Sequence, residues 1–364
     1  MPPSIVSTSG SAGHNGALTI VGSGFEAKSI ASPVVWDNCS GVVLSPAQVG
    51  VLWTGYWPSS GTVPYQMQYR AAPYRSIAAP HSRVGQYMAG AHGDDAGAAA
   101  GYNVMCWKAR TVSSFPRYTY ASWYSRNDNA FVFGLGVGDN NYKIYDYSVG
   151  TEPYDLPNNW YTEHNSRFSS ASDTGGAWHV NDDDGSLDGT TPWGDTAVNP
   201  WNQWVKYEHY IKLSNVALGG FIKLFENGVR VDNYTVAGTR TDAMAGTARN
   251  DSIGGYCRNK PNANNFRYFA DLYLDHTLQH VSLGNASTIG ACTVLECQVP
   301  TVWSDGAITV TVNRGAIADE ANAWVYVYDT TGTSNTNGFL ASSGVPVVTR
   351  RGVVSVLSRR YMTL

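Results

Sequence analysis

The stretch LTIVGSGFEAK (Leu18–Lys28) is an apolar alternating run that is broken by Gly22 and Gly24. A second alternating run, VPTVWSDGAITVTVNRGAI (Val299–Ile317), lies near the other end of the chain. Alternation with a period of two is typical of a β-strand with one buried face. We therefore expect the two runs to pair, which would make residues 31–284 an insertion into one small β-sandwich.

The composition fits an all-β protein. Of 364 residues, 43% are hydrophobic and only 14% are charged, whereas Gly, Tyr and Trp are abundant. Strands favour aromatic and β-branched residues, and turns favour Gly and Asn. The formal net charge of -4 provides no broad cationic surface, so nucleic acid is not an expected partner. No stretch has the apolar length of a membrane helix, so no membrane partner is expected either.

The middle of the chain shows short alternating runs separated by Gly, Asn and Asp, with almost no helical periodicity. The clearest hairpin is GGFIKLFENGVRVDNYTV (219–236), in which Asn227-Gly228 can supply the positive φ angles of a tight turn. One strand is therefore predicted on each side of this turn, with Ile222 and Leu224 on the same face.

Other segments also have the pattern of strands. We expect three strands within 117–150, one within 204–215, and one long strand, bent near His276, over 266–284. In this order the segments and the hairpin resemble the concanavalin A-like, laminin G-like jelly roll. Lectins, laminin-type adhesion modules, polysaccharide lyases and glycosidases share that fold, so the resemblance implies a fold and leaves the activity open.

The two terminal runs resemble the immunoglobulin-like TIG domain, whose first hairpin typically carries TITGSGFG. The match covers Thr19–Phe25, with Glu26 where the family often has Gly. The resemblance implies an all-β chain in which a large jelly-roll sandwich is inserted into a smaller immunoglobulin-like sandwich. The expected limits are 1–30 and 285–343 for the two parts of the TIG-like sandwich, 31–284 for the jelly roll, and 344–364 for a C-terminal hairpin or docking tail.

The cysteines lack the spacing of a metal site. We expect free thiols, and the alternative is a bridge between Cys292 and Cys297. The five positions are Cys39, Cys106, Cys257, Cys292 and Cys297.

The acidic loop NDDDGSLDGTTPWGD (181–195) is a candidate calcium site. Its residues fall at positions 1, 3, 5, 6 and 12 of a calcium loop, namely Asp184, Ser186, Asp188, Gly189 and Asp195. Asp replaces the usual bidentate Glu and no flanking helices are predicted, so a solvated surface loop is the alternative. Calcium is the one cofactor that the sequence indicates.

Six aromatic residues lie close to Gly, Pro, Asn or Asp, which predicts loops instead of alternating strands. An exposed aromatic face packs well against a sugar ring. The alternative is that these residues cap the ends of the sandwich as core. The candidate glycan-binding residues are Trp57, Trp160, Tyr161, Trp178, Trp193 and Trp201.

An enzyme of this fold that acts on uronates would need a Tyr or His base and a cation that neutralises the carboxylate. The candidates are His81, Arg70, Arg75 and Tyr87. The signatures typical of alginate lyases, an R-x-E-L-R strand with Q-I-H, are missing, as are other catalytic motifs. The alternative is that these are structural polar residues.

These observations favour a non-enzymatic structural or adhesion protein of a virion or cell-surface assembly, which binds glycan or decorates the assembly. Modules of the two kinds that the sequence resembles normally work outside cells, whereas the first residues lack the basic and apolar segments of a classical signal peptide. A bacteriophage virion, or an extracellular surface reached by a non-classical route, reconciles these two observations and is the expected location. The expected partners are other subunits, as a homo-oligomer or with virion proteins, and cell-surface polysaccharide. The alternative is a polysaccharide lyase or glycosidase that uses the concave face of the jelly roll.

Overall fold

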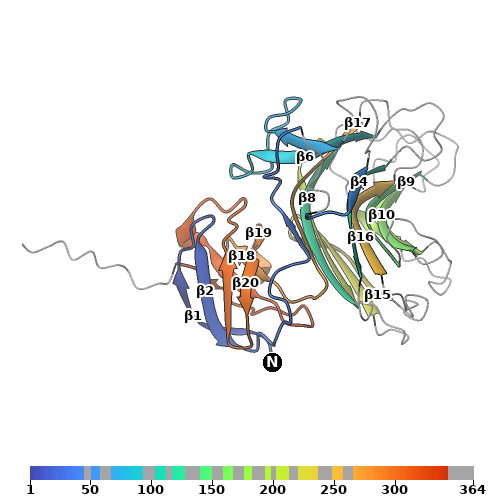
Figure 1. Ribbon diagram of the computed structural model, residues 1–364. Coiled ribbons are helices and arrows are strands. Elements are labelled where there is room, and N and C mark those ends of the chain that lie inside the picture. The colour runs from blue at the N-terminus through green and yellow to red at the C-terminus, as the bar shows by residue number, and fades with distance from the viewer. Residues whose placement is uncertain are drawn as a thin grey trace, which may run out of the picture.

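The computed structural model shows an all-β protein built from two sandwiches (Figure 1). In the part of the chain that it describes, the helical elements are two short 3-10 helices, η1 (Ile289–Ala291) and η2 (Glu320–Asn322). No helix in that part is long and apolar enough to cross a membrane. The described residues are 1–44, 51–57, 67–92, 103–111, 117–127, 140–149, 159–166, 176–182, 193–197, 202–212, 220–236, 248–256 and 265–342.

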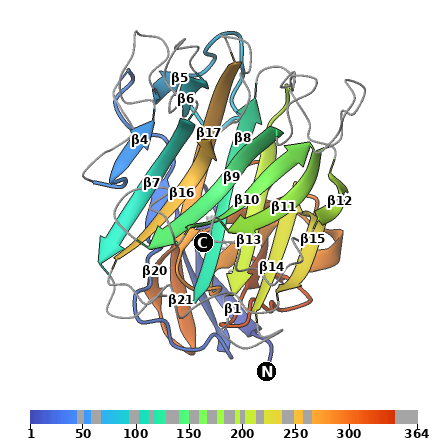
Figure 2. The ribbon, with the colours of Figure 1, turned by 90° about the vertical axis from the view of Figure 1, so that its right-hand side faces the viewer.

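The large sandwich consists of two antiparallel sheets, and Figure 2 looks onto it with one of them in front. We call this front sheet the distal sheet because it lies away from the second sandwich (Figure 1). In spatial order it contains β12 (Trp193–Ala197), β11 (Gly176–Asp182), β10 (Asn159–Ser166), β9 (Asn140–Val149), β16 (Ala248–Tyr256), β7 (Asn103–Thr111) and β4 (Gly55–Trp57).

The other sheet of the large sandwich faces the second sandwich, and we call it the junction sheet. β3 (Val35–Asp37) pairs with one of its central strands, β17. In spatial order the sheet contains β15 (Val229–Val236), β14 (Gly220–Glu226), β13 (Val205–Lys212), β8 (Tyr118–Asn127), β17 (Asn265–Asp275), β6 (Gln86–His92) and β5 (Gln68–Ala71).

The predicted hairpin forms the edge of the junction sheet. Asn227 (φ 50°) and Gly228 (φ 75°) make the turn between β14 and β15, in the left-handed region that this turn requires. Along β14 the residues alternate in burial, so that Ile222 and Leu224 enter the core between the two sheets. The pattern of the sequence is therefore confirmed at this element.

Aromatic side chains fill the core of the large sandwich. Trp53 and Trp123 are fully buried there, and Trp123 lies over Tyr145 of the distal sheet with 6.3 Å between ring centroids. Their polar atoms need partners in such an interior. Asp37 supplies one, because its Oδ2 accepts hydrogen bonds from Trp53 Nε1 at 2.8 Å and from the Tyr69 hydroxyl at 2.7 Å.

The second sandwich is built from both ends of the chain, and we call it the terminal sandwich. Its core is shared by two four-stranded sheets. The first contains β1 (Ser4–Gly10), β2 (Ala17–Ser23), β21 (Ala307–Thr311) and β20 (Val299–Trp303), and the second β19 (Leu295–Cys297), β18 (Val281–Gly284), β22 (Trp324–Val327) and β23 (Phe339–Leu340).

The two terminal runs of sequence pair as expected. Leu18 of β2 lies opposite Val310 of β21, and both are fully buried. Phe25 and Trp303 belong to the same hydrophobic cluster. A side chain at Gly22 would place its Cβ 2.0 Å from the carbonyl oxygen of Ser4, so the close approach of β1 requires glycine here. The ends of the chain thus close one core.

The expected single strand over 266–284 is wrong, because its two halves belong to different sheets. β17 ends at Asp275 in the junction sheet, whereas β18 pairs with β19 and β22 in the terminal sandwich. The turn between them is fixed by Gln279, whose Nε2 donates to the backbone carbonyl oxygen of Phe25 at 2.9 Å. Residues 276–280 therefore carry the chain from one sandwich to the other.

The four cysteines in the described residues are free thiols, as expected. Cys297 does not bridge to Cys292, because its Sγ lies 3.0 Å from the Tyr120 hydroxyl while Cys292 Sγ donates to the carbonyl oxygen of Thr288. Cys257 and the expected C-terminal tail at 344–364 lie outside the described residues.

Candidate functional site

The terminal sandwich packs against one face of the junction sheet, and we call this contact the module junction. At its centre the Oε1 atom of Glu296 accepts a hydrogen bond from the Tyr124 hydroxyl at 2.6 Å, and its Oε2 lies 3.4 Å from Lys206 Nζ. Burial lowers the pKa of Lys206, but the carboxylates of Glu296 and Glu208 outweigh burial and raise it. Lys206 therefore remains charged inside a buried ion pair.

Stacked rings complete the module junction. His280 lies between Tyr120 and Tyr328, with 3.7 and 3.9 Å between ring centroids. Burial lowers the pKa of His280 to about 3, and its Nδ1 donates to the carbonyl oxygen of Leu278 at 2.8 Å. The imidazole is therefore neutral at physiological pH, which suits a packing role.

On the same face, Glu208 accepts a hydrogen bond from the Tyr120 hydroxyl at 2.8 Å. Its neighbour His209 lies on the opposite face, against Trp123 in the core. Adjacent residues of a strand point to opposite sides, so these two side chains do not share a site. Glu208 is therefore part of the packed contact between the sandwiches.

Three of the four residues of the alternative catalytic set are held by packing contacts. The buried Tyr87 hydroxyl accepts from the backbone N–H of Tyr74 at 2.8 Å and donates to its carbonyl oxygen at 3.1 Å. Arg70 lies over the ring of Tyr74, at 4.7 Å from the centroid, and Arg75 lies 4.1 Å from the ring centroid of Phe266. These contacts stabilise the chain segment between β5 and β6.

His81, the fourth residue, has a different environment. Its Nε2 lies 2.9 Å from Oδ2 of Asp271, which sits at a bulge of β17 with φ 48°. Both residues line a pocket of about 210 Å³ together with Arg83. His81 Nδ1 has no hydrogen-bond partner in the described part of the chain. A histidine oriented by a carboxylate beside a cavity has the geometry of a general base.

The prediction that the candidate aromatic residues lie in loops was wrong for five of them, which lie in strands. Turn-forming residues such as Asn159 and Gly176 begin these short strands, so their presence did not mark loops. Trp201 lies outside the described residues. The other five share the distal sheet: Trp57 (β4), Trp160 and Tyr161 (β10), Trp178 (β11) and Trp193 (β12).

The candidate calcium loop stays a prediction. Asp184, Ser186 and Asp188 lie outside the described residues, and Asp195 lies in β12. Within the described part of the chain, no group of three or more His, Cys, Asp or Glu residues could hold a metal ion.

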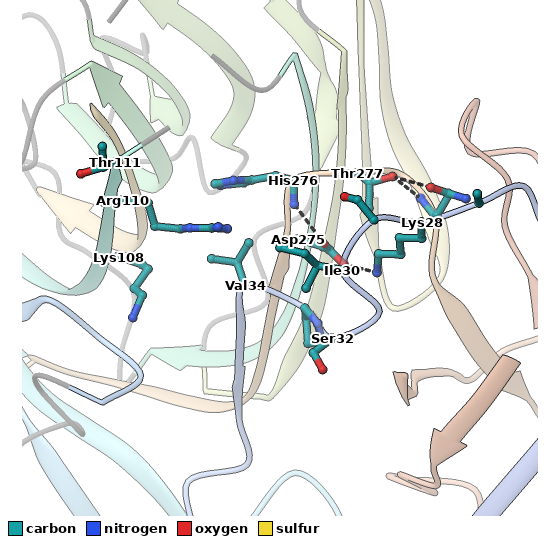
Figure 3. Close-up of a pocket in the computed structure, with 14 residues that line it drawn as sticks. Lys28, Ile30, Ser32, Val34, Lys108, Arg110, Thr111, Asp275, His276 and Thr277 are labelled. Carbon is teal, nitrogen blue, oxygen red and sulfur yellow. Dashed lines mark hydrogen bonds and ion pairs between the residues drawn. The ribbon is translucent and has the colours of Figure 1, made fainter. Parts of the chain in front are cut away.

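A pocket of about 730 Å³ lies where the chain passes between the two sandwiches, and we call it the crossing pocket (Figure 3). Residues 27–34, which enter the large sandwich, line one side, and residues 275–279, which leave it, line another. The end of β7 contributes Lys108, Arg110 and Thr111. Sequence reasoning missed this pocket because its residues come from three distant segments that share no motif.

No protein-family model and no curated protein sequence matches this chain. Among solved structures, the alginate lyase Aly36B aligns with 52% of this chain and 80% of its own, at 14% identity and a TM-score of 0.37. The alginate lyase vAL-1 from Chlorella virus aligns with 54% of this chain and 88% of its own, at 13% identity and a TM-score of 0.36. The cellulose induced protein Cip1 covers 62% of this chain and 92% of its own, at 14% identity and a TM-score of 0.35. Similarity at this level assigns no activity to the chain.

Proposed function

We propose that this chain is a non-enzymatic structural or adhesion protein that holds the distal sheet toward a carbohydrate partner. The observation that carries the proposal is the module junction, where the terminal sandwich occupies one face of the junction sheet through the buried pair Lys206–Glu296. The distal sheet lies on the opposite side of the large sandwich (Figure 1). With one side of the large sandwich fixed to the terminal sandwich, the distal sheet on the other side is free to face a binding partner.

Aromatic residues support carbohydrate as the partner. The strands of the distal sheet contain Trp57, Trp160, Tyr161, Trp178 and Trp193, which come from four different strands. Aromatic rings contribute large contact areas to binding surfaces and pack against the apolar faces of sugars. Because adjacent residues such as Trp160 and Tyr161 point to opposite faces, the proposed polysaccharide site uses those of the five that share one face of the distal sheet.

The proposal also assigns a module type to each sandwich. The large sandwich would be a laminin G-like module, and the terminal sandwich a TIG-like module that attaches it to other subunits. The assembly would be a virion or another extracellular surface, and the partner a cell-surface polysaccharide. The pairing of β2 with β21 supports this arrangement, because it anchors both ends of the large sandwich in one small unit.

Binding to immobilised neutral and acidic polysaccharides tests the proposal. We expect Tyr161→Ala and Trp193→Ala, whose positions the strand register places on the same face of the distal sheet, each to weaken binding at least about tenfold, which corresponds to about 1.4 kcal/mol. Val302→Ala is the matched control, since Val302 is 56% exposed on β20 of the terminal sandwich. Equal binding by all three variants would contradict a site on the distal sheet.

A second candidate, a polysaccharide lyase or glycosidase, is favoured by one observation. His81 is oriented by Asp271 and lines a pocket with Arg83, which could neutralise a uronate carboxylate. Incubation with polysaccharides, followed by measurement of unsaturated products and reducing ends, separates the two functions. Turnover that is abolished by His81→Ala would establish the enzyme and overturn the binding proposal.

A further inference from the structure

The crossing pocket carries an excess of positive charge. Among its lining residues, Lys28, Lys108 and Arg110 are cationic and Asp275 is the one carboxylate, which leaves a formal excess of two positive charges. Asp275 is already engaged, because its Oδ2 lies 2.6 Å from Lys28 Nζ. The two cations of β7 therefore have no carboxylate of the lining available to them.

The acidic residue behind the pocket is engaged as well. Asp251 is fully buried and binds Arg249, with Oδ1 2.6 Å from Nη2, and His276, with Oδ2 2.6 Å from Nε2. Its Oδ1 also accepts a hydrogen bond from the Tyr145 hydroxyl. These partners occupy both oxygens of Asp251. In the described part of the chain, Arg110 consequently has no acidic partner.

The cations of β7 affect each other in the pocket. Burial and then the charge of Arg110 lower the pKa of Lys108. Lys108 Nζ donates to the carbonyl oxygen of Val51 at 3.4 Å, and among the described residues no carboxylate pairs with its positive charge. Figure 3 shows Arg110 extending toward His276, beside Val34. An anion in the pocket would relieve the repulsion between these cations.

The remaining lining indicates more than a bare inorganic anion. Ile30, Pro33 and Val34 provide apolar surface, and Ser32 and Thr111 provide hydroxyl groups. Pockets of about 300–1,000 Å³, often found between domains, are typical of sites for small organic ligands. The crossing pocket fits this range and lies between two sandwiches.

We propose that the crossing pocket binds a small hydroxylated carboxylate, such as one uronic acid unit, with Arg110 as the partner of the carboxylate and Lys108 as a second cation. The planar guanidinium can donate two parallel hydrogen bonds to a carboxylate. Ser32 and Thr111 are placed to bond hydroxyl groups, and Val34 to pack against the carbon skeleton. The pocket includes the end of β7 of the distal sheet but none of the aromatic residues of the proposed polysaccharide site, so this inference does not depend on the function proposed above.

Calorimetric titration of the full chain with sodium D-glucuronate tests the proposal, with glucose, acetate and sulfate as comparison ligands at constant ionic strength. We expect glucuronate to bind in the millimolar range or more tightly. Acetate and sulfate should bind at least about tenfold more weakly, and glucose should give no signal. No binding of glucuronate would overturn the site. Equal binding of acetate or sulfate would overturn the assignment of the ligand class.

Variants then locate the site. Arg110→Gln should weaken glucuronate binding at least about tenfold, because one bidentate charged contact is lost. Arg230→Gln is the matched control, since it removes the same charge from an exposed position on β15. Arg110→Lys keeps the positive charge but loses the two parallel donors of the guanidinium. Its affinity for glucuronate should lie between those of Arg110→Gln and Arg230→Gln. Thermal unfolding of each variant verifies that it is folded. Equal weakening by Arg110→Gln and Arg230→Gln would overturn the proposal, because a general charge effect would then explain binding.

Discussion

At the module junction Lys206 Nζ lies 3.4 Å from a carboxylate oxygen of Glu296, whereas in the crossing pocket Lys108 Nζ approaches one backbone carbonyl oxygen at the same distance. Both regions lie where the two sandwiches meet. In the first, each buried charge has a partner inside the protein, and in the second two cations have none among the described residues. The contact between the sandwiches therefore pairs its charges at the module junction, which holds the two sandwiches together. In the crossing pocket it leaves positive charge available for a ligand.

The largest expected loss of stability comes from breaking the ion pair between Lys206 and Glu296 at the module junction. Glu296→Gln leaves the buried ammonium of Lys206 without its carboxylate, so we expect a loss of about 3–5 kcal/mol in the free energy of unfolding. Chemical denaturation measures this loss. The double variant Lys206→Met/Glu296→Gln should recover most of it, because the unpaired charge is then gone. A loss below about 1 kcal/mol in the single variant would show that the pair does not hold the junction.

The carboxylate of the crossing pocket gives the next effect, through pH. Burial raises the pKa of Asp275 to about 6 from an ordinary 3.8, although Lys28 opposes the shift. The folded chain then binds this proton more tightly than the unfolded chain, so the contribution to stability is complete below about pH 4 and is lost as the pH rises through 6.

Denaturation curves between pH 4 and pH 7 measure this contribution as the stability of the natural chain minus that of Asp275→Asn. We expect the difference to fall with rising pH by on the order of 1–3 kcal/mol. Asp251 has the opposite sign, because Arg249 and His276 outweigh burial and lower its pKa, and its effect cancels in the subtraction. A difference that stays flat or rises with pH would contradict a raised pKa at Asp275.

A smaller loss of stability is expected from a substitution in the core of the terminal sandwich, on which the position of both regions depends. Ile308 is fully buried on β21, so Ile308→Val should cost about 0.5–1.5 kcal/mol through one lost methylene group. Val302→Ala on the neighbouring strand β20 should stay within about 0.5 kcal/mol, because Val302 is exposed. Thermal unfolding of both variants checks the contrast, and equal losses would place the core elsewhere.

The smallest expected change in stability comes from a substitution in the crossing pocket, and it gives the clearest contrast with the module junction. Arg110→Gln removes a cation that has no acidic partner among the residues that the structure describes. The stability should therefore change by less than about 0.5 kcal/mol, with an increase if Lys108 is relieved of repulsion. Denaturation of this variant beside Glu296→Gln makes the comparison direct. A loss of more than about 2 kcal/mol would identify Arg110 as structural.

The sequence predicted the elements that local patterns determine. Asn227-Gly228 specified a turn, and the alternation around Leu18 and Ile308 specified two strands that share a core. It failed at 266–284, where an apolar pattern continues although the chain changes sheets after Asp275. Periodicity records which residues are buried and does not record which sheet buries them.

The candidate sites were harder to predict than the fold. The aromatic residues of the distal sheet were expected in loops because Asn and Gly at strand ends resemble turn signals. Lys28 and Arg110 come together only through the fold, so no spacing in the sequence could indicate the crossing pocket. The module junction was also hidden from sequence reasoning, because Tyr124, which donates a hydrogen bond to Glu296, lies 172 positions away in the sequence.

The closure of the terminal sandwich by both ends of the chain also determines an order of folding. Thr19 of β2 and its neighbour Thr309 of β21 are separated by 290 positions. During synthesis β2 therefore emerges long before β21, the strand with which it pairs. The large sandwich, whose strands all lie between these two, can complete its sheets first, and the terminal sandwich closes only when the ribosome has released β21.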